Sequence, residues 1–169
     1  MNTNPERVDA RKDIRVLIAD DDETILECYR KAFSGGERPA HRLALDTLEA
    51  ELFETPGEAA PSVHFSVVAC SQGREAVDLA AAATRAGRPF DVVILDVRMP
   101  PGIDGVEAGR QIRRLDPEVE IVFVTGYSDI PRDELERRVP PPLKLHYFNK
   151  PISFLRLAED VADMVQASP

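Results

Sequence analysis

The sequence predicts an α/β domain in which a five-stranded parallel sheet carries helices on both faces. Two observations lead to this fold class. Five short apolar runs alternate along the chain with segments of helical periodicity, and strands that alternate with helices build parallel sheets. Each apolar run also ends directly in polar or charged residues, as expected for loops beyond the carboxyl ends of parallel strands. With 169 residues, of which 43% are hydrophobic, the chain can form one such domain with a sizeable core.

The predicted strands are short runs rich in β-branched residues. They cover residues 14–19, 63–69, 92–95, 121–124 and 145–148. Helices are predicted between them from apolar spacing and from Gly and Pro at their ends, over residues 25–33, 71–86, 105–115 and 132–138. The first of these helices has apolar residues at helical spacing, namely Ile25, Leu26, Tyr29 and Phe33. Ser153 is predicted to cap a final helix whose inward-facing residues are Leu155, Ala158, Ala162 and Val165.

Two segments lie outside this alternation. Residues 1–13 are predicted to be a flexible polar lead, which leaves 14–169 as the domain. Residues 37–61 are bracketed by prolines and are predicted to be an insertion that contains an amphipathic helix, with Leu45, Leu48 and Leu52 on one face. Such a helix either packs locally on the surface of the domain or binds a partner, and the sequence leaves both interpretations open.

Composition excludes several classes of function. The formal charge of −9 makes the chain a poor ligand for a nucleic-acid backbone, which requires clustered Lys and Arg. Cys28 and Cys70 fit no metal-ligand spacing and are too few for a disulfide framework, so we expect a reducing compartment. The first residues are polar, and no apolar run approaches ~18 residues, so we expect neither a signal peptide nor a membrane span. A cytoplasmic location follows as the expectation.

Five reactive residues directly follow the predicted strands. Asp20 and Asp21 follow the first strand, Asp96 the third, Thr125 the fourth and Lys150 the fifth. The carboxyl ends of parallel strands meet at one edge of the sheet, so these side chains are expected to lie close together there.

This set of residue types suits phosphoryl transfer. Carboxylates packed together repel one another unless a cation joins them, and a hard dication with oxygen ligands, most often Mg²⁺ where phosphate is handled, meets that need. A carboxylate can serve as the nucleophile and become an aspartyl phosphate. The Lys ammonium and the Thr hydroxyl can then stabilise the charge on the phosphoryl oxygens.

The chain resembles the receiver domains of two-component response regulators, of the kind seen in single-domain chemotaxis regulators. The resemblance rests on the stretches RVLIADDDETIL, DVVILDVRMPPGIDG, IVFVTGYS and YFNKPI, and it covers about residues 14–165 except for 37–61. It implies a flavodoxin-like fold with strand order 2-1-3-4-5. It also implies a domain activated by phosphorylation rather than an enzyme, with at most slow self-dephosphorylation.

The same resemblance implies a role for each residue of the acidic site. Asp96 would be the phosphoacceptor. Asp21, Asp96 and the backbone carbonyl of Arg98 would bind Mg²⁺ (or Mn²⁺) directly, and Asp20 would act mainly through water.

The resemblance also implies roles for residues of the last two strands. Thr125 would hydrogen-bond the phosphoryl group and Lys150 would pair with it. Tyr147 would rotate inward together with Thr125 on activation, and the bond between Lys150 and Pro151 would be cis.

The partners implied are a histidine kinase or a histidine phosphotransfer protein as phosphoryl donor, and a downstream protein or output domain that the sequence does not name. No direct contact with nucleic acid or membrane is expected, and the chain is expected to be a monomer or a weak homodimer. No output domain is expected after the last helix, since the sequence ends at Pro169.

Two features depart from the family pattern. The loop 99–102 carries one residue more than usual. The helix near 132–138 is short and is followed by three prolines, where the family has a full helix on its usual output and dimer face.

Three other functions are less consistent with the sequence. A haloacid-dehalogenase-like phosphatase would use Asp20, Asp22 and Thr24 of IADDDET, with Thr125 and Lys150 in the order of that family. It needs a later acidic pair at a strand end, whereas the late acidic residues fall on the last predicted helix, and it leaves Asp96 unexplained. A degenerate receiver acting only as a protein-binding scaffold is disfavoured by the complete set of acids, Thr and Lys. A dinucleotide-binding domain is excluded because the first strand–helix turn has no glycines.

Overall fold

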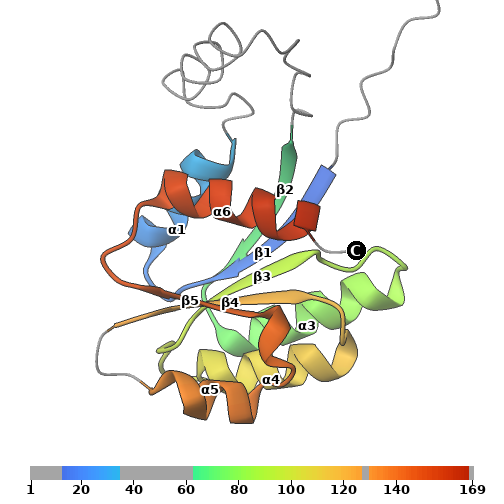
Figure 1. Cartoon of the computed structure of the whole chain (residues 1–169), viewed down its shortest axis with the longest axis vertical. Coiled ribbons are helices and arrows are strands. Elements are labelled where there is room, and N and C mark those ends of the chain that lie inside the picture. Colours follow the sequence, from blue (N-terminus) through green and yellow to red (C-terminus); the bar gives the residue numbers. More distant parts are fainter. Residues whose placement is uncertain (1–12, 35–62, 127–129, 168–169) are drawn as a thin grey trace, which may run out of the picture.

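The computed structural model describes residues 13–34, 63–126 and 130–167, which form one parallel sheet covered by helices on both faces (Figure 1). The five strands lie in the order β2-β1-β3-β4-β5, and all neighbouring pairs are parallel. This confirms the predicted fold class and strand order. The strands are β1 (Asp13–Ala19), β2 (His64–Cys70), β3 (Val92–Asp96), β4 (Glu120–Thr125) and β5 (Leu145–Asn149).

The central strands are apolar between their end residues because both of their faces are covered. Every residue of β3 and β4 is buried, including Asp96 and Thr125 at their carboxyl ends. Strands buried on both faces have continuous apolar sequences rather than alternating ones. Asp96 pairs in register with Val124, so the ends of β3 and β4 are level at the carboxyl edge.

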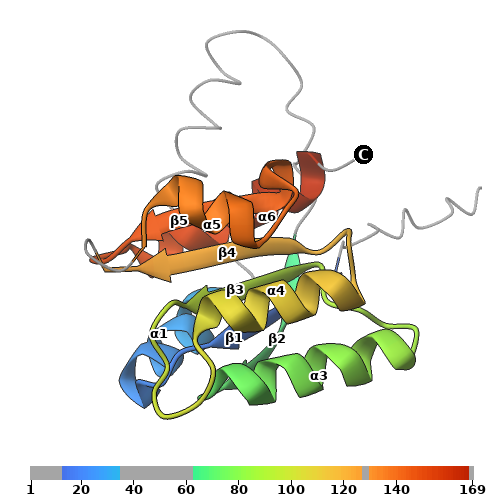
Figure 2. The ribbon, with the colours of Figure 1, turned by 90° about the horizontal axis from the view of Figure 1, so that it is seen from below.

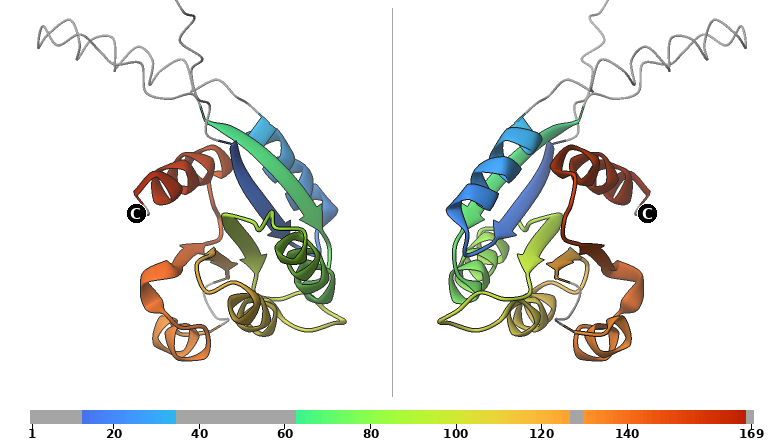
Figure 3. Two further views of the ribbon diagram at one scale, coloured as in Figure 1. Left: turned by 90° about the vertical axis from the view of Figure 1, so that its right-hand side faces the viewer. Right: turned by 90° about the vertical axis from the view of Figure 1, so that its left-hand side faces the viewer.

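Two layers of helices enclose the sheet. One layer contains α1 (Glu23–Ser34) and α6 (Phe154–Ala167), and Figure 3 shows it on the opposite side of the sheet from the other helices. Figure 2 looks onto the second layer, in which α4 lies between its two neighbours. This layer consists of α3 (Gly73–Arg85), α4 (Gly105–Leu115) and α5 (Arg132–Arg138).

Each layer has its own hydrophobic core. In the α1–α6 layer, the ring of Tyr29 meets that of Phe154 edge-on at 4.8 Å, which joins the two helices. In the other layer, α4 approaches the sheet closely at Gly109, where an added Cβ would lie 2.9 Å from the ring of Phe123 and 3.2 Å from Leu95. The glycine therefore allows α4 to pack directly onto β3 and β4.

The inward face predicted for the last helix is partly wrong. Leu155 is 60% exposed, whereas Leu157 is 1% exposed and buried with Ala158 and Val165. Residues two positions apart lie about 200° apart around a helix, so burial of Leu157 turns Leu155 to the outside. Ser153 begins the helix as expected, accepting a hydrogen bond from Arg156 N at 3.4 Å.

Some predictions concern residues that the structure does not describe. The insertion 37–61 with its amphipathic helix, and the lead except for Asp13, lie outside the described residues. The short helix predicted near 132–138 is confirmed as α5, which is followed by a 3-10 turn at Pro142–Lys144. Among the described residues, no helix has the length and apolar character needed to cross a membrane.

Candidate functional site

The strand order brings the predicted reactive residues to one edge of the sheet. Asp20 directly follows β1, Asp96 ends β3, Thr125 ends β4 and Lys150 directly follows β5. Backbone hydrogen bonds continue beyond the strands, since Lys150 N donates to Thr125 O at 2.8 Å. The lysine is thereby fixed to the end of the neighbouring strand.

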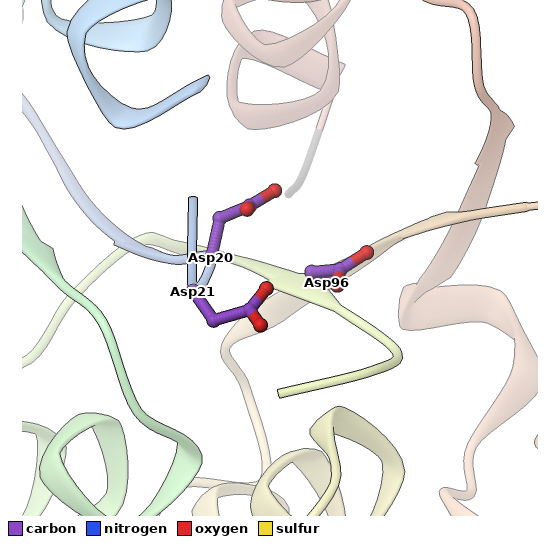
Figure 4. Close-up of side chains that lie close together, drawn as sticks. All are labelled: Asp20, Asp21 and Asp96. Carbon is purple, nitrogen blue, oxygen red and sulfur yellow. The ribbon is translucent and has the colours of Figure 1, made fainter. Parts of the chain in front are cut away.

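Three carboxylates gather at this edge and form what we call the acidic cluster, Asp20, Asp21 and Asp96. One oxygen of each lies within 4.8 Å of the others. Figure 4 shows the three side chains next to one another, two from the end of β1 and one from the end of β3. Asp20 is 2% exposed and Asp96 7% exposed, while Asp21 is open to solvent. The cluster is therefore buried on one side and accessible on the other.

Lys150 lies between the two buried acids. Its Nζ is 2.9 Å from Asp96 Oδ1 and 3.2 Å from Asp20 Oδ2. Asp20 also accepts a hydrogen bond from Asp22 N at 3.0 Å. Asp20 is therefore held by two donors from different parts of the chain.

Burial and charge act in opposite directions at this site. Burial raises the pKa of Asp96 above its usual range, and the hydrogen bond and charge of Lys150 oppose this rise without cancelling it. For Lys150, burial lowers the pKa, but the hydrogen bond to Asp96 and the charges of Asp96 and Asp20 outweigh it, and the net pKa is raised. The ammonium form of Lys150 is therefore favoured beside the carboxylates.

A tight loop follows the acid of β3. Arg98 N donates to Asp96 Oδ2 at 3.2 Å, and Gly105 N donates to Val97 O at 3.0 Å, which closes the loop at its base. A Cβ at Gly105 would overlap the carbonyl oxygen of Asp96, so no larger residue fits there without movement of the backbone. The sequence indicates only a turn at Asp104 and Gly105. The structure adds that Gly105 supports the backbone of Asp96 and that Asp104 caps α4 through Glu107 N at 2.7 Å.

Thr125 ends the strand next to Asp96, and Tyr147 lies within the neighbouring strand β5, in register with Phe123. Thr125 is 5% exposed, and its Oγ1 donates to Gly126 O at 2.6 Å. Tyr147 packs against the core of the α3–α5 layer, with its ring 4.9 Å from the guanidinium of Arg132. Burial, above all, raises the pKa of Tyr147 to about 12. The bond between Lys150 and Pro151 is cis.

The acidic cluster fits a divalent cation. Three carboxylates at −3 and one lysine at +1 leave a formal charge of −2 among these four groups. Carboxylate oxygens are the ligands that Mg²⁺ and Mn²⁺ prefer. Asp20, Asp21 and Asp96 are thus the side chains that could hold such an ion.

The residues that the phosphatase alternative requires are used differently. Asp22 is exposed, and its Oδ1 accepts a hydrogen bond from Thr24 N at 2.8 Å at the start of α1. This bond is the main cause of the lowered pKa of Asp22. The late acidic residues Glu159, Asp160 and Asp163 lie on α6 rather than at a strand end. The acid that completes the cluster is Asp96, which that alternative leaves without a role.

Comparisons with known proteins place this site in a family. The sequence model of the response regulator receiver domain matches residues 58–161, more than half of the chain. The match includes Asp96, Thr125 and Lys150 and begins after Asp20 and Asp21.

Two relatives and one solved structure agree with this match. The response regulator MprA of Mycolicibacterium vanbaalenii is 30% identical over 126 residues, which cover 75% of this chain and 38% of that protein. The sensor kinase CckA of Brucella abortus is 31% identical over 102 residues, which cover 60% of this chain and 10% of that protein. The chain thus spans well under two thirds of either relative.

The structural comparison extends over nearly the whole fold. A response regulator receiver protein from Sinorhizobium medicae superposes with a TM-score of 0.60 at 21% identity, over 92% of this chain and 97% of that one. At this identity the likeness concerns the fold alone. Fold, strand-end residues and the match over 58–161 lead to one conclusion: this chain belongs to the response regulator receiver domain family.

Proposed function

We propose that this chain is a phosphorylation-activated receiver that accepts a phosphoryl group on Asp96 from a histidine kinase or a histidine phosphotransfer protein. One observation carries the proposal. The Asp96 carboxylate is 7% exposed, contacts Lys150 at 2.9 Å and shares its surroundings with two further acids. A solvated surface carboxylate would have none of these neighbours.

The transfer is a displacement at phosphorus. An oxygen of the Asp96 carboxylate forms a bond to the phosphorus of the donor phosphohistidine. The P–N bond breaks, and its electron pair stays on the imidazole nitrogen, which takes up a proton. Lys150 is close enough to pair with the negative charge that gathers on the phosphoryl oxygens. Hydrolysis of the acyl phosphate by water returns Asp96 to its starting state, so we propose no enzymatic activity beyond slow self-dephosphorylation.

Magnesium or manganese belongs to the same proposal. Asp20, Asp21 and Asp96, with the backbone carbonyl of Arg98, would hold the ion, and Asp20 would act mainly through water. A bound divalent ion supplies positive charge that offsets the charge of the phosphoryl group.

Activation is proposed to run through Thr125 and Tyr147. The Thr125 hydroxyl, now donating to Gly126 O, would turn to the phosphoryl group, and Tyr147 would occupy its inward position in the activated state. Phosphorylation would shift the balance between two conformations and alter the surface that a downstream protein or output domain meets. We further propose that the domain extends over residues 14–169 with an insertion at 37–61, and that it acts in the cytoplasm as a monomer or weak homodimer.

Intact-mass measurement tests the assignment of Asp96. The protein is incubated with Mg²⁺ and a small phosphodonor such as acetyl phosphate, alongside Asp96→Asn and the control Asp133→Asn, whose side chain is 79% exposed on α5. We expect wild type and the control to gain one phosphoryl group and Asp96→Asn to gain none. Equal uptake by Asp96→Asn, or none by wild type, overturns the proposal. Steady release of phosphate from monoesters that Asp20→Asn abolishes would favour the phosphatase.

A further inference from the structure

The turn between β2 and α3 contacts both parts of the chain that carry the acidic cluster. At its start, Cys70 O accepts a hydrogen bond from Asp20 N at 3.3 Å. Two residues later, Gln72 Nε2 donates to Pro100 O at 3.2 Å, in the loop that follows Asp96. A single short turn therefore joins the end of β1 to the loop after β3.

The side chain of Gln72 is directed to this loop rather than to its own helix. Gln72 is the N-cap residue of α3, with φ −139° and ψ 142°, yet its side chain makes no capping hydrogen bond. Ser, Thr, Asp and Asn are the residues preferred for capping. The longer Gln side chain instead lies along the loop, where a Cβ added at Gly102 would be 3.1 Å from Gln72 Oε1.

The loop 97–104 is held at two places. At its base, Gly105 N bonds to Val97 O at 3.0 Å. Along its outer part, besides the bond from Gln72, Gly73 approaches so closely that an added Cβ would lie 2.6 Å from Ile103 O. Gly73 and Gly105 leave space for the loop, and Gln72 supplies the hydrogen bond at its outer part.

The position of this loop matters for the site because Arg98 belongs to it. Arg98 N orients Asp96 through Oδ2 at 3.2 Å, and the carbonyl of Arg98 is the backbone ligand proposed for the cation. The hydrogen bond from Gln72 is made at the outer part of the loop, so it limits the arrangements that the loop can adopt. Displacement of a binding group by about 1 Å is enough to weaken a site substantially.

We infer that Gln72 is a positioning residue: its side-chain amide holds the loop 97–104 in the arrangement that presents Arg98 and Asp96 to the cation. This inference rests on the function proposed for Asp96 and extends it to a residue outside the strand-end set. The contact is made by a neutral side chain that is not among the groups proposed to hold the cation or the phosphoryl group.

The test compares Gln72→Met, which keeps the length of the side chain but removes the donor, with Arg74→Ala as a matched control. Arg74 lies in the first turn of the same helix, is exposed and pairs only with Asp78, at 3.4 Å, among the contacts described for it. Two quantities are measured on the full chain: the Mg²⁺ dissociation constant by calorimetry, and the amide hydrogen exchange of residues 97–104 without metal. Loss of one neutral hydrogen bond predicts a change of about three- to tenfold in each for Gln72→Met, and none for Arg74→Ala.

The outcomes separate the inference from the function on which it rests. Unchanged Mg²⁺ affinity and unchanged loop exchange in Gln72→Met overturn the role of Gln72, even if wild type is phosphorylated. Faster exchange with unchanged affinity also overturns it, because Gln72 would then hold the loop without affecting the site. If wild type binds no Mg²⁺ and takes up no phosphoryl group, the proposed function itself fails, whatever the exchange of the loop.

Discussion

The two edges of the sheet both contain buried ionisable groups, but they differ in how these charges are balanced. At the amino ends of β4 and β5, Glu120 is 6% exposed and meets Lys144 Nζ at 3.4 Å and His146 Nε2 at 2.9 Å. At the carboxyl ends, Lys150 pairs with Asp20 and Asp96, and Asp21 adds a third carboxylate beside them. We call the first group, with the nearby Arg113, the amino-edge network.

In the amino-edge network, each buried charged side chain has partners within the protein, although Arg113 Nε has no hydrogen-bond partner among the described residues. Arg113 of α4 is 6% exposed and donates to the backbone carbonyls of Pro117, Val119 and Lys144, which ties α4 to the starts of two strands. The acidic cluster instead has an excess of negative charge. Three carboxylates beside one lysine leave negative charge that a bound cation would balance. The following predictions test this contrast.

Arg113→Met is expected to cause the largest loss of stability. It removes the donor from three carbonyls that precede β4 and β5, one buried and two part-buried, and we expect a loss of about 2–4 kcal/mol in the free energy of unfolding. Urea denaturation measures it, with the exposed neighbour in Arg114→Met as control. Equal stability of the two variants would show that the amino-edge network is not needed for folding.

Glu120→Gln should lower the free energy of unfolding by about 1–3 kcal/mol, because Lys144 and His146 lose the carboxylate between them. Glu118→Gln, at a side chain that is 83% exposed, is the matched control. The measurement is again urea denaturation, at neutral pH. A gain in stability from Glu120→Gln would contradict the expected difference, because a buried carboxylate would then be unfavourable at both edges of the sheet.

Asp96→Asn makes the same change at the other edge and is expected to have the opposite sign. Burial raises the folded-state pKa of Asp96, so ionisation disfavours the folded state. The contribution of Asp96 to the stability of the wild type should therefore decline as the pH rises from the unfolded value near 3.8 through the folded pKa, and level off above it. Without divalent cations at pH 7, Asp96→Asn should be more stable by about 0.5–2 kcal/mol.

The dependence on conditions tests the cause of this gain. The advantage of Asp96→Asn should shrink as the pH falls through the raised folded pKa towards 3.8, and it should be gone below 3.8, where Asp96 is protonated in both states of the wild type. It should also shrink when Mg²⁺ is added, because the ion binds folded wild type. Thermal melts at several pH values, with and without Mg²⁺, measure both effects. A gain that is independent of pH would have to come from packing rather than charge.

The last prediction concerns the chemical reactivity of Cys70, which ends β2 at the carboxyl edge, and it is the smallest effect expected. Burial, above all, raises the pKa of its thiol to about 12, and the charge of Glu75 adds to this. At pH 8 only about one thiol in ten thousand is ionised, so iodoacetamide should modify the half-buried Cys28 well before Cys70. Peptide mapping over time measures the order. Faster reaction at Cys70 would mean that this edge opens more readily than its packing implies.

The acidic cluster was predictable because strand topology does most of the placement. Asp20, Asp96 and Lys150 each follow an apolar run, and parallel strands must bring such positions to the same edge. The amino-edge network was not predicted. Glu120 and Arg113 look like surface residues in the sequence, because charged side chains are rarely buried and their partners lie on other elements.

Other details depend on packing that periodicity cannot resolve. Leu155 and Leu157 are both apolar residues near the start of a helix, and only the contact of α6 with the sheet decides which of them is buried. The same holds for Gly105, whose neighbour is the backbone of Asp96 rather than any residue close in a pattern. Thr125 was placed at the right edge, but the direction of its hydroxyl is a rotamer choice that the sequence does not encode.

The backbone hydrogen bond from Lys150 N to Thr125 O has a mechanical consequence. It joins the ends of β4 and β5, so a shift of the Thr125 backbone would also move the backbone of Lys150. A phosphoryl group that contacted both side chains would connect the same two residues a second time, through their side chains. We therefore expect Thr125 and Lys150 to change position together when the phosphoryl group is bound, rather than independently.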